Sequence, residues 1–313
     1  CCNKSGKPLK DELKYEKIVD IIKQAKQLVA KSIVVIGGGE PTIYPKFKEI
    51  IKKINLLKMT PVIFTNTQTI NKNFAKFLFK NNVSVIIKLD SLNRKLQDDL
   101  VGVVGAYDKI HAGLKNLLST GYKSSLDKGR YKLGASFVVN KKNYKEIPDI
   151  WKFCRENKII PNLEMMIPNG LAKNQRKLIL KRDQWRKLKF NLLEIDRKEF
   201  GYDWLPFVPL AGMGCFQVMY NIYISIDGNA RPCSSIHCKV ANVNNLSLKQ
   251  IINTPFFRIA RNIEKYLAGK CGRCRYHKKC IGCRGLAYSI NKIKGEEDVA
   301  ALCSEDPSCF LAS

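Results

Sequence analysis

The sequence predicts an α/β protein, with a parallel sheet in its first part and a small cysteine-rich α+β domain in its last third. Two observations carry this prediction. Helical and β-branched segments alternate five times before residue 168, and nine of the twelve cysteines lie after residue 214. The segment between these regions is apolar and interrupted by prolines, as is typical of a connector. We place the first domain at 1–195, the connector at 196–214 and the second domain at 215–313.

Each of the five repeats is an amphipathic helix followed by a short apolar strand. In the first repeat, Leu13, Ile18 and Ile21 have helical spacing, and residues 32–36 form the β-branched run of a buried parallel strand. Alternating elements of this kind form a parallel sheet with right-handed crossovers. The expected helices are 10–30, 47–57, 73–80, 106–120 and 147–156, and the strands that follow them are 32–36, 61–65, 84–90, 132–139 and 162–167.

The cysteines of the last third have the spacing of metal ligands. Four of them, Cys271, Cys274, Cys280 and Cys283, form a C-x2-C-x5-C-x2-C loop. Thiolates in such a loop select zinc, Cu(I) or iron-sulfur clusters. Upstream lies a C-x12-G-x4-C segment, and further cysteines follow on both sides, so the thiols outnumber the ligands of one tetrahedral site. Two four-thiolate sites would use about eight of them.

This order of cysteines, from Cys215 to Cys309, resembles the SPASM extension of radical SAM enzymes, which holds two auxiliary 4Fe-4S clusters. One spacing departs from the family, which commonly has three residues where this chain has two between Cys280 and Cys283. The resemblance implies a first cluster on Cys215, Cys233 and Cys283, and a second on Cys271, Cys274, Cys280 and a late cysteine.

Two ligand positions are open in this assignment. We choose Cys309 over Cys303 as the late ligand, because Asp306-Pro307-Ser308-Cys309 resembles the D-P-x-C ending of many SPASM proteins. Cys238 is expected to complete the first cluster. If it does not, one iron of that cluster stays open to substrate or to an exchangeable ligand.

The first part of the chain carries a second resemblance to the same family. Gly38-Gly39-Glu40-Pro41 follows the first expected strand and resembles the GGEP motif, where the strand edge binds the amino group of the methionine moiety of S-adenosylmethionine. The implied fold is the partial (β/α)6 barrel of radical SAM enzymes, with its first strand missing from this chain. The active site is then expected at the carboxyl ends of the strands.

Three further residues are cofactor candidates by position in this barrel. Asn66 follows the second expected strand in a T-N element, although the family's next glycine is Thr67 here. Lys88 stands where the family has a small hydroxyl residue, and it either pairs with the methionine carboxylate or reaches solvent. Ser136 on the next strand is a comparable candidate.

The start of the chain, Cys1-Cys2-Asn3, resembles the tail of the family's C-x3-C-x2-C cluster loop. The resemblance implies that Cys1 is the third ligand of the catalytic 4Fe-4S cluster, with Cys2 as the alternative, and that two ligands precede the sequence given. We therefore expect the intact gene product, and not this chain as given, to start radical chemistry.

Charge and cysteine content limit the setting of the protein. The formal net charge of +28 would attract phosphate, but the lysines are spread over helix faces without interleaved aromatic residues. Nucleic acid is therefore an unlikely partner. No signal peptide or membrane span is evident, and clustered thiols suit a reducing compartment. We expect a cytoplasmic protein in an anaerobic setting.

The predicted function is that of a radical SAM oxidoreductase or maturase. Such an enzyme reductively cleaves S-adenosylmethionine, and the 5′-deoxyadenosyl radical abstracts hydrogen from a substrate. We expect a peptide or protein substrate, and an electron donor such as ferredoxin or flavodoxin. The alternatives are an enzyme that modifies tetrapyrrole propionates, a degenerate paralogue with structural clusters only, and a non-catalytic zinc-stabilised nucleic-acid-binding module.

Overall fold

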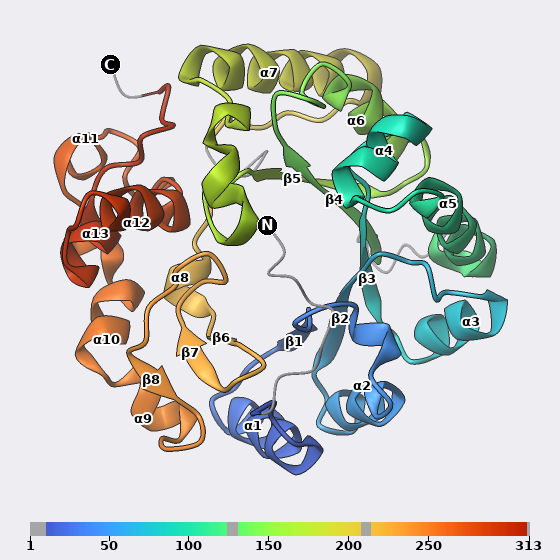
Figure 1. The fold of residues 1–313 in the computed structure, drawn as a ribbon, viewed down its shortest axis with the longest axis horizontal. Coiled ribbons are helices and arrows are strands. Elements are labelled where there is room, and N and C mark those ends of the chain that lie inside the picture. Colours follow the sequence, from blue (N-terminus) through green and yellow to red (C-terminus); the bar gives the residue numbers. More distant parts are fainter. Residues whose placement is uncertain (1–10, 124–130, 208–213, 312–313) are drawn as a thin grey trace. The chain divides into compact units, whose positions relative to one another are not determined.

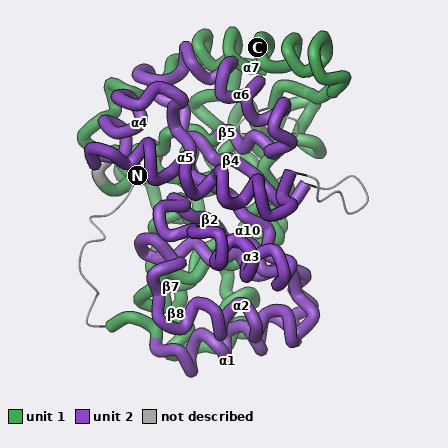
Figure 2. Tube along the Cα trace, turned by 90° about the vertical axis from the view of Figure 1, so that its right-hand side faces the viewer, with its two compact units in different colours: residues 1–13, 164–313 green, residues 14–163 purple. Residues whose placement is uncertain are grey.

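A computed structural model describes residues 11–123, 131–207 and 214–311. The chain forms two compact units, residues 14–163 and residues 1–13 with 164–313 (Figure 2). The connector predicted at 196–214 lies within the second of these units, and the domain boundaries drawn from the sequence stay a prediction. No helix in the described ranges is long and apolar enough to cross a membrane.

The unit of residues 14–163 is built on a parallel sheet. Its strands follow one another in sequence order, and the pairs β1 with β2, β2 with β3, and β3 with β4 are parallel (Figure 1). This confirms the predicted α/β class and places the carboxyl ends of neighbouring strands at one edge. The strands are β1 (Ser32–Val35), β2 (Thr60–Thr65), β3 (Ser84–Lys88), β4 (Leu133–Val139) and β5 (Ile160–Met165).

The helices that alternate with these strands, beginning with α1 before β1, lie along one face of the sheet (Figure 1). Their buried residues, such as Ile51 and Ile54 on α2, recur at helical spacing, which is why periodicity found them. The helices are α1 (Tyr15–Gln27), α2 (Phe47–Leu56), α3 (Lys72–Lys80), α4 (Arg94–Val101), α5 (Ala106–Leu117) and α6 (Ile147–Glu156).

The sequence did not predict helix α4. Its only buried residue is polar, Gln97, so no apolar stripe marks it. The side chain of Asn93 caps it by accepting a hydrogen bond from the N–H of Leu96 at 3.0 Å. Gln97 also ends the preceding strand earlier than expected, because its side-chain oxygen accepts from the N–H groups of Asp90 and Ser91 at 2.9 and 2.8 Å.

The second unit combines helices with a small antiparallel sheet. An antiparallel hairpin places Tyr223 opposite Arg231, and a short third strand pairs with it. The strands are β6 (Tyr223–Ile224), β7 (Asn229–Arg231) and β8 (Ala241–Asn242). The helices are α7 (Arg182–Ile195), α8 (Gln217–Tyr220), α9 (Leu248–Ile252), α10 (Pro255–Arg261), α11 (Gly269–Gly272), α12 (Arg284–Ile293) and α13 (Asp298–Cys303).

Four helices of the first unit end in the same way. Val29, Lys58, Asn82 and Lys158 have φ between 53° and 62°, and each lies just after the end of α1, α2, α3 or α6. At α2, the N–H of Lys58 donates to the carbonyl of Asn55 at 2.8 Å, and the N–H of Met59 donates to that of Ile54 at 3.2 Å. This is the Schellman pattern, which turns the chain from helix to strand and usually takes glycine at the left-handed position.

We expect Lys58→Gly and Lys158→Gly each to raise the free energy of unfolding by about 0.5–1 kcal/mol. A non-glycine residue loses about 1–2 kcal/mol in the left-handed region, and the greater chain entropy of glycine offsets part of the gain. Urea unfolding measures the change. The matched control is Lys52→Gly, inside α2, which should lower stability by about 1 kcal/mol. Equal losses in all three variants would contradict the assignment.

Candidate cofactor and cluster sites

A glycine turn follows β1 at the carboxyl edge of the sheet. Gly37 has φ of +75°, and the three glycines from Gly37 to Gly39 are exposed. Within the described ranges, the backbone groups of Gly38 and Gly39 make no hydrogen bond with other residues. The turn therefore presents unpaired N–H and C=O groups to a ligand, as a glycine-rich strand end can.

The carboxylate of Glu40 joins this turn to the end of β2. Its Oε1 accepts hydrogen bonds from the N–H and hydroxyl of Thr42, at 3.2 and 2.6 Å, and from the hydroxyl of Thr65 at 2.8 Å. Its Oε2 accepts from the N–H of Asn66 at 2.7 Å. Pro41 is buried and starts a 3-10 turn, Pro41–Ile43. Both carboxylate oxygens of Glu40 thus accept hydrogen bonds from other protein groups. Glu40 therefore acts on a ligand indirectly, because it fixes the conformation of the glycine turn.

The predicted T-N element after β2 forms a strained turn. The side-chain oxygen of Asn66 accepts a hydrogen bond from the N–H of Gln68 at 3.1 Å. Thr67, where the family has glycine, keeps a positive φ of 60° and is fully buried. Its hydroxyl donates to the carbonyl of Ile110 at 2.9 Å, which helps to hold a conformation that costs a branched residue about 1–3 kcal/mol.

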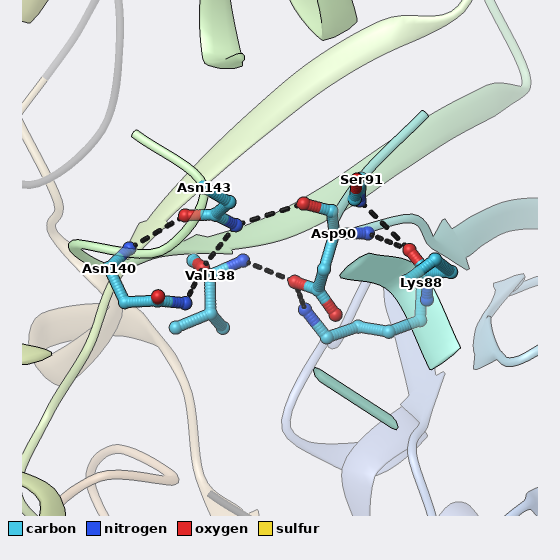
Figure 3. Close-up of polar contacts among 7 residues, drawn as sticks. Lys88, Asp90, Ser91, Val138, Asn140 and Asn143 are labelled. Atoms are coloured by element: carbon cyan, nitrogen blue, oxygen red, sulfur yellow. Dashed lines mark hydrogen bonds and ion pairs between the residues drawn. The ribbon is translucent and has the colours of Figure 1, made fainter. Parts of the chain in front are cut away.

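Lys88 and Ser136 lie side by side where β3 pairs with β4. The ammonium of Lys88 forms an ion pair with Asp90 at 2.7 Å, and its side chain is 37% exposed (Figure 3). The same oxygen of Asp90 accepts from the N–H of Val138 at 2.8 Å, so the carboxylate ties the two strands together. Lys88 thus pairs with a protein carboxylate, whereas the expectation was that it pairs with the methionine carboxylate or reaches solvent. Ser136 is buried.

Asn143 completes the polar group that Figure 3 shows. Its side-chain amide donates to the carbonyl of Asp90 at 2.9 Å and to that of Val138 at 3.1 Å. Its oxygen accepts from the N–H of Asn140 at 2.9 Å. Neither Asp90 nor Asn143 was predicted as a site residue, although Asp90 lies two residues after the candidate Lys88.

The predicted cluster ligands of the second unit include two groups of cysteines, within which thiolates raise the pKa of other thiols. Burial raises the pKa of Cys283 well above its ordinary value, and the nearby Asp306 carboxylate and the Cys215 and Cys233 thiolates raise it further. Burial also raises the pKa of Cys215 to about 11, with Cys233 and Glu164 contributing. Cys215, Cys233 and Cys283, which we call the first cysteine group, thus influence one another electrostatically. Their assignment to the first cluster stays a prediction.

The second cysteine group contains Cys271, Cys280 and Cys309. Burial raises the pKa of Cys280 to about 11, and the nearby Cys309 and Cys271 thiolates add to the shift. Burial likewise raises the pKa of Cys271, and Cys309 is again among the groups that raise it. Cys274, the remaining predicted ligand, lies half-buried in the same loop. The crossed assignment, in which the cysteine loop contributes to both clusters, stays a prediction.

Backbone N–H groups point at the sulfur atoms of both groups. The N–H of Ser235 donates to Cys233, and the N–H of Leu286 donates to Cys283. The N–H groups of Tyr276, Gly282 and Asp306 donate to Cys274, Cys280 and Cys271, in that order. All five N–H groups lie 3.3–3.5 Å from the sulfur atoms. Such bonds favour the thiolate, the form that binds metal, and hydrogen bonds to sulfur tune iron-sulfur clusters. The donor set therefore fits a pair of 4Fe-4S clusters.

Three buried charged residues surround these thiols, and the sequence analysis gave none of them a role. Asp306 accepts the N–H of Cys283 at 2.6 Å, and its own N–H donates to Cys271. Arg284 donates from its guanidinium to the sulfur of Cys271 at 3.6 Å. Lys189 is fully buried on α7, where burial lowers its pKa to about 7 and the Cys280 thiolate opposes the shift. Gly282 has φ of +66°, and a Cβ there would lie 2.7 Å from Asp306.

The remaining cysteines have other surroundings. Cys238 and Cys303 lie in an apolar cluster with Val218, Ile236 and Phe256. Burial raises the pKa of Cys238 to about 11, and its charged neighbours are Asp298 and Arg231. Its place in the first cluster stays a prediction. Cys1 and Cys2 fall outside the described residues.

No three His, Cys, Asp or Glu side chains among the described residues converge as the ligands of a single metal ion do. The thiolates of a 4Fe-4S cluster bind separate irons, so such a cluster does not require that convergence.

We expect Glu40→Gln to lower the free energy of unfolding by about 1–3 kcal/mol. The amide keeps only one acceptor oxygen, so it leaves at least one partly buried N–H or hydroxyl without a charged acceptor. Denaturant unfolding of the cluster-free protein measures the loss. Glu49→Gln, on the exposed face of α2, is the control and should change stability little. A loss no larger than in the control would refute the cross-link.

We expect about eight auxiliary irons per chain, with matching sulfide, after reconstitution without oxygen. Cys283→Ala and Cys309→Ala should each lose about four of them, because they remove ligands of different clusters. Cys154→Ala is the control, since that thiol is buried on α6 and distant in sequence from both groups. Zinc without sulfide would instead support the alternative of a non-catalytic, zinc-stabilised nucleic-acid-binding module.

The chain matches two protein families. Residues 1–154 match the Radical SAM superfamily, and residues 215–275 match SPASM, an iron-sulfur cluster-binding domain. Among curated relatives, the AdoMet-dependent heme synthase of Methanosarcina barkeri is 24% identical over 303 residues, covering 86% of this chain and 82% of the relative. Mycofactocin maturase MftC of Mycobacterium ulcerans is 25% identical over 309 residues, covering 90% of this chain and 77% of the relative.

A solved structure shares the fold. Streptococcus suis SuiB bound to S-adenosylmethionine superposes with a TM-score of 0.69 at 22% identity, covering 98% of this chain and 72% of SuiB. This similarity confirms the predicted fold, and the two family matches confirm S-adenosylmethionine and 4Fe-4S clusters as the cofactors. The chain therefore belongs to the radical SAM superfamily and carries a SPASM domain.

Proposed function

We propose that the intact enzyme is a maturase that abstracts hydrogen from a peptide or protein substrate. When bound, S-adenosylmethionine and its 4Fe-4S cluster supply a 5′-deoxyadenosyl radical, which takes the hydrogen atom. The protein's own residues orient that cofactor and exclude water. The observation that carries the proposal is the glycine turn fixed by Glu40, whose Gly38 and Gly39 backbone groups have no partner among the described residues. The two cysteine groups of the second unit add to it.

Gly38 and Gly39 would hold the methionine moiety through their backbone groups. Their conformation is set by Glu40, which ties them to the end of β2. Asn66 lies on the same edge, but its side-chain oxygen already accepts from Gln68, which leaves its amide group for a ligand. A ligand carboxylate near Lys88 would share its ammonium with Asp90, because the ammonium has three donors.

The two cysteine groups would serve the step after hydrogen abstraction. The first group would hold one cluster and the second group, with Cys274, the other, and such clusters would supply redox centres for an oxidative reaction. Burial raises the pKa of Cys280 and Cys283, and Cys283 is buried while Cys280 is partly exposed. An oxidative modification of the substrate follows naturally from such an arrangement.

Two similarities favour a peptide substrate. SuiB, which shares the fold, is known in a structure bound to its precursor peptide SuiA, and that structure covers 99% of this chain. The relative MftC is a mycofactocin maturase. The net charge of +28 would favour an acidic peptide segment through long-range attraction.

A tetrapyrrole with propionate groups is the second candidate. It is favoured by the similarity to AdoMet-dependent heme synthases, three of which match over 86–89% of this chain. The same positive charge would attract propionates. The two candidates differ in the substrate that stimulates the radical reaction, and a single assay separates them.

We expect an acidic peptide pool to raise 5′-deoxyadenosine release by the reconstituted, intact enzyme by roughly tenfold over the rate without substrate, because substrate binding completes the site. Chromatography quantifies the nucleoside, and mass spectrometry identifies peptides that lose hydrogen. A propionate-bearing iron porphyrin is the matched probe. Stimulation by the porphyrin alone would overturn the peptide proposal and establish the second candidate. No nucleoside with either probe, despite full cluster content, would contradict both.

A further inference from the structure

Two buried cations lie beside the second cysteine group. Arg284, the first residue of α12, is 2% exposed, and its guanidinium donates to the sulfur of Cys271 at 3.6 Å. Lys189, on α7, is completely buried, and the negative charge of the Cys280 thiolate favours its protonated form against the effect of burial on its pKa. The two cations come from different helices and approach different thiols of one group. A buried positive charge is costly unless negative groups compensate for it.

The contacts of Arg284 leave one donor for a bound group. One terminal nitrogen donates to the carbonyls of Leu302 and Ser304 at 3.1 and 2.5 Å, and the other donates to Cys271. Its Nε is buried and has no hydrogen-bond partner among the described residues. An unpaired buried donor is rare, and it often marks a partner that the protein alone does not provide. The sulfur atoms of a cluster on Cys271 would be such a partner.

The first cysteine group has surroundings of the opposite sign. Glu164 is close enough to Cys215 and Cys233 to raise the pKa of both thiols, and Asp306 does the same for Cys283. Asp306 also influences Cys271 and Cys280, so it contributes to both groups. The two cysteine groups therefore differ in their charged neighbours. The first group has the negative charge of Glu164, and the second has the positive charges of Arg284 and Lys189.

We propose that Arg284 and Lys189 are positioning residues that raise the reduction potential of the cluster on Cys271, Cys274, Cys280 and Cys309 above that of the cluster on the first group. The inference rests on the cluster ligands of the proposed function. Reduction adds one electron and breaks no bond, so nearby positive charge stabilises the reduced cluster and negative charge disfavours it. Screening is weak in this buried region, so the difference favours electron transfer from the first cluster to the second.

The test is a redox titration of the reconstituted protein, followed by electron paramagnetic resonance. Lys189→Met keeps the length of the side chain and removes its charge. We expect it to make reduction of one cluster about tenfold less favourable, a shift of about 59 mV to lower potential for a one-electron couple. The other cluster should keep its potential. Cys309→Ala identifies which signal belongs to the second group.

Arg284→Gln should lower the same potential, and Arg284→Lys, which keeps the charge, should restore most of it. The matched controls are Lys187→Met, an exposed lysine on α7, and Arg273→Gln, an exposed arginine of the cysteine loop. Both should leave the two potentials unchanged. If Arg284→Gln loses iron because its anchor to Leu302 and Ser304 is gone, Lys189→Met decides alone.

Unchanged potentials in Lys189→Met and Arg284→Gln, at full iron and sulfide content, would overturn this inference and leave the cluster ligands intact. A wild-type chain that binds no auxiliary iron would instead overturn the ligand assignment itself. Iron content and potential therefore separate the two failures.

Discussion

The hydrogen bonds to the Glu40 carboxylate are the contacts on which the cofactor end of the sheet depends. Parallel strands β1 and β2 leave their carboxyl ends at one edge, but nothing in the ladder itself fixes the turns that follow. Glu40 accepts from Thr42, Thr65 and Asn66, and so it fixes both turns at once. Asp90 does the same one step along the sheet, where it joins the ends of β3 and β4. Two carboxylates thus give an edge of flexible turns a defined shape.

The second unit meets a different requirement, because it must bury many thiols and still bring them together. A cysteine loop alone cannot do this, since its backbone would leave N–H groups unpaired. Here those groups donate to the sulfur atoms, so the loop satisfies its own backbone while it prepares the thiolates. Asp306 links the two cysteine groups through Cys283 and Cys271, which makes the D-P-x-C segment a part of both sites.

Features with a repeating pattern could be predicted from the sequence, and features that depend on one buried side chain could not. The five helix-strand repeats were found because apolar residues mark them, and the cysteine groups because spacing marks them. Helix α4 was missed because its buried residue is Gln97. Lys189 was missed because it is one of many lysines, and only burial distinguishes it. Arg284 adjoins a cysteine of the motif, and this adjacency was the one signal that could have drawn attention to it.

The contact between helix α5 and the turn at Thr67 has a mechanical consequence. A Cβ at Gly113 would lie 2.2 Å from the carbonyl oxygen of Thr67. The obstacle is backbone, so no replacement at position 67 would make room for a side chain at 113. The hydroxyl of Thr67 also donates to the carbonyl of Ile110, and at Gly113 the turn and the helix meet backbone to backbone. Only glycine at 113 permits this approach, and the position of α5 therefore helps to define the turn at the end of β2.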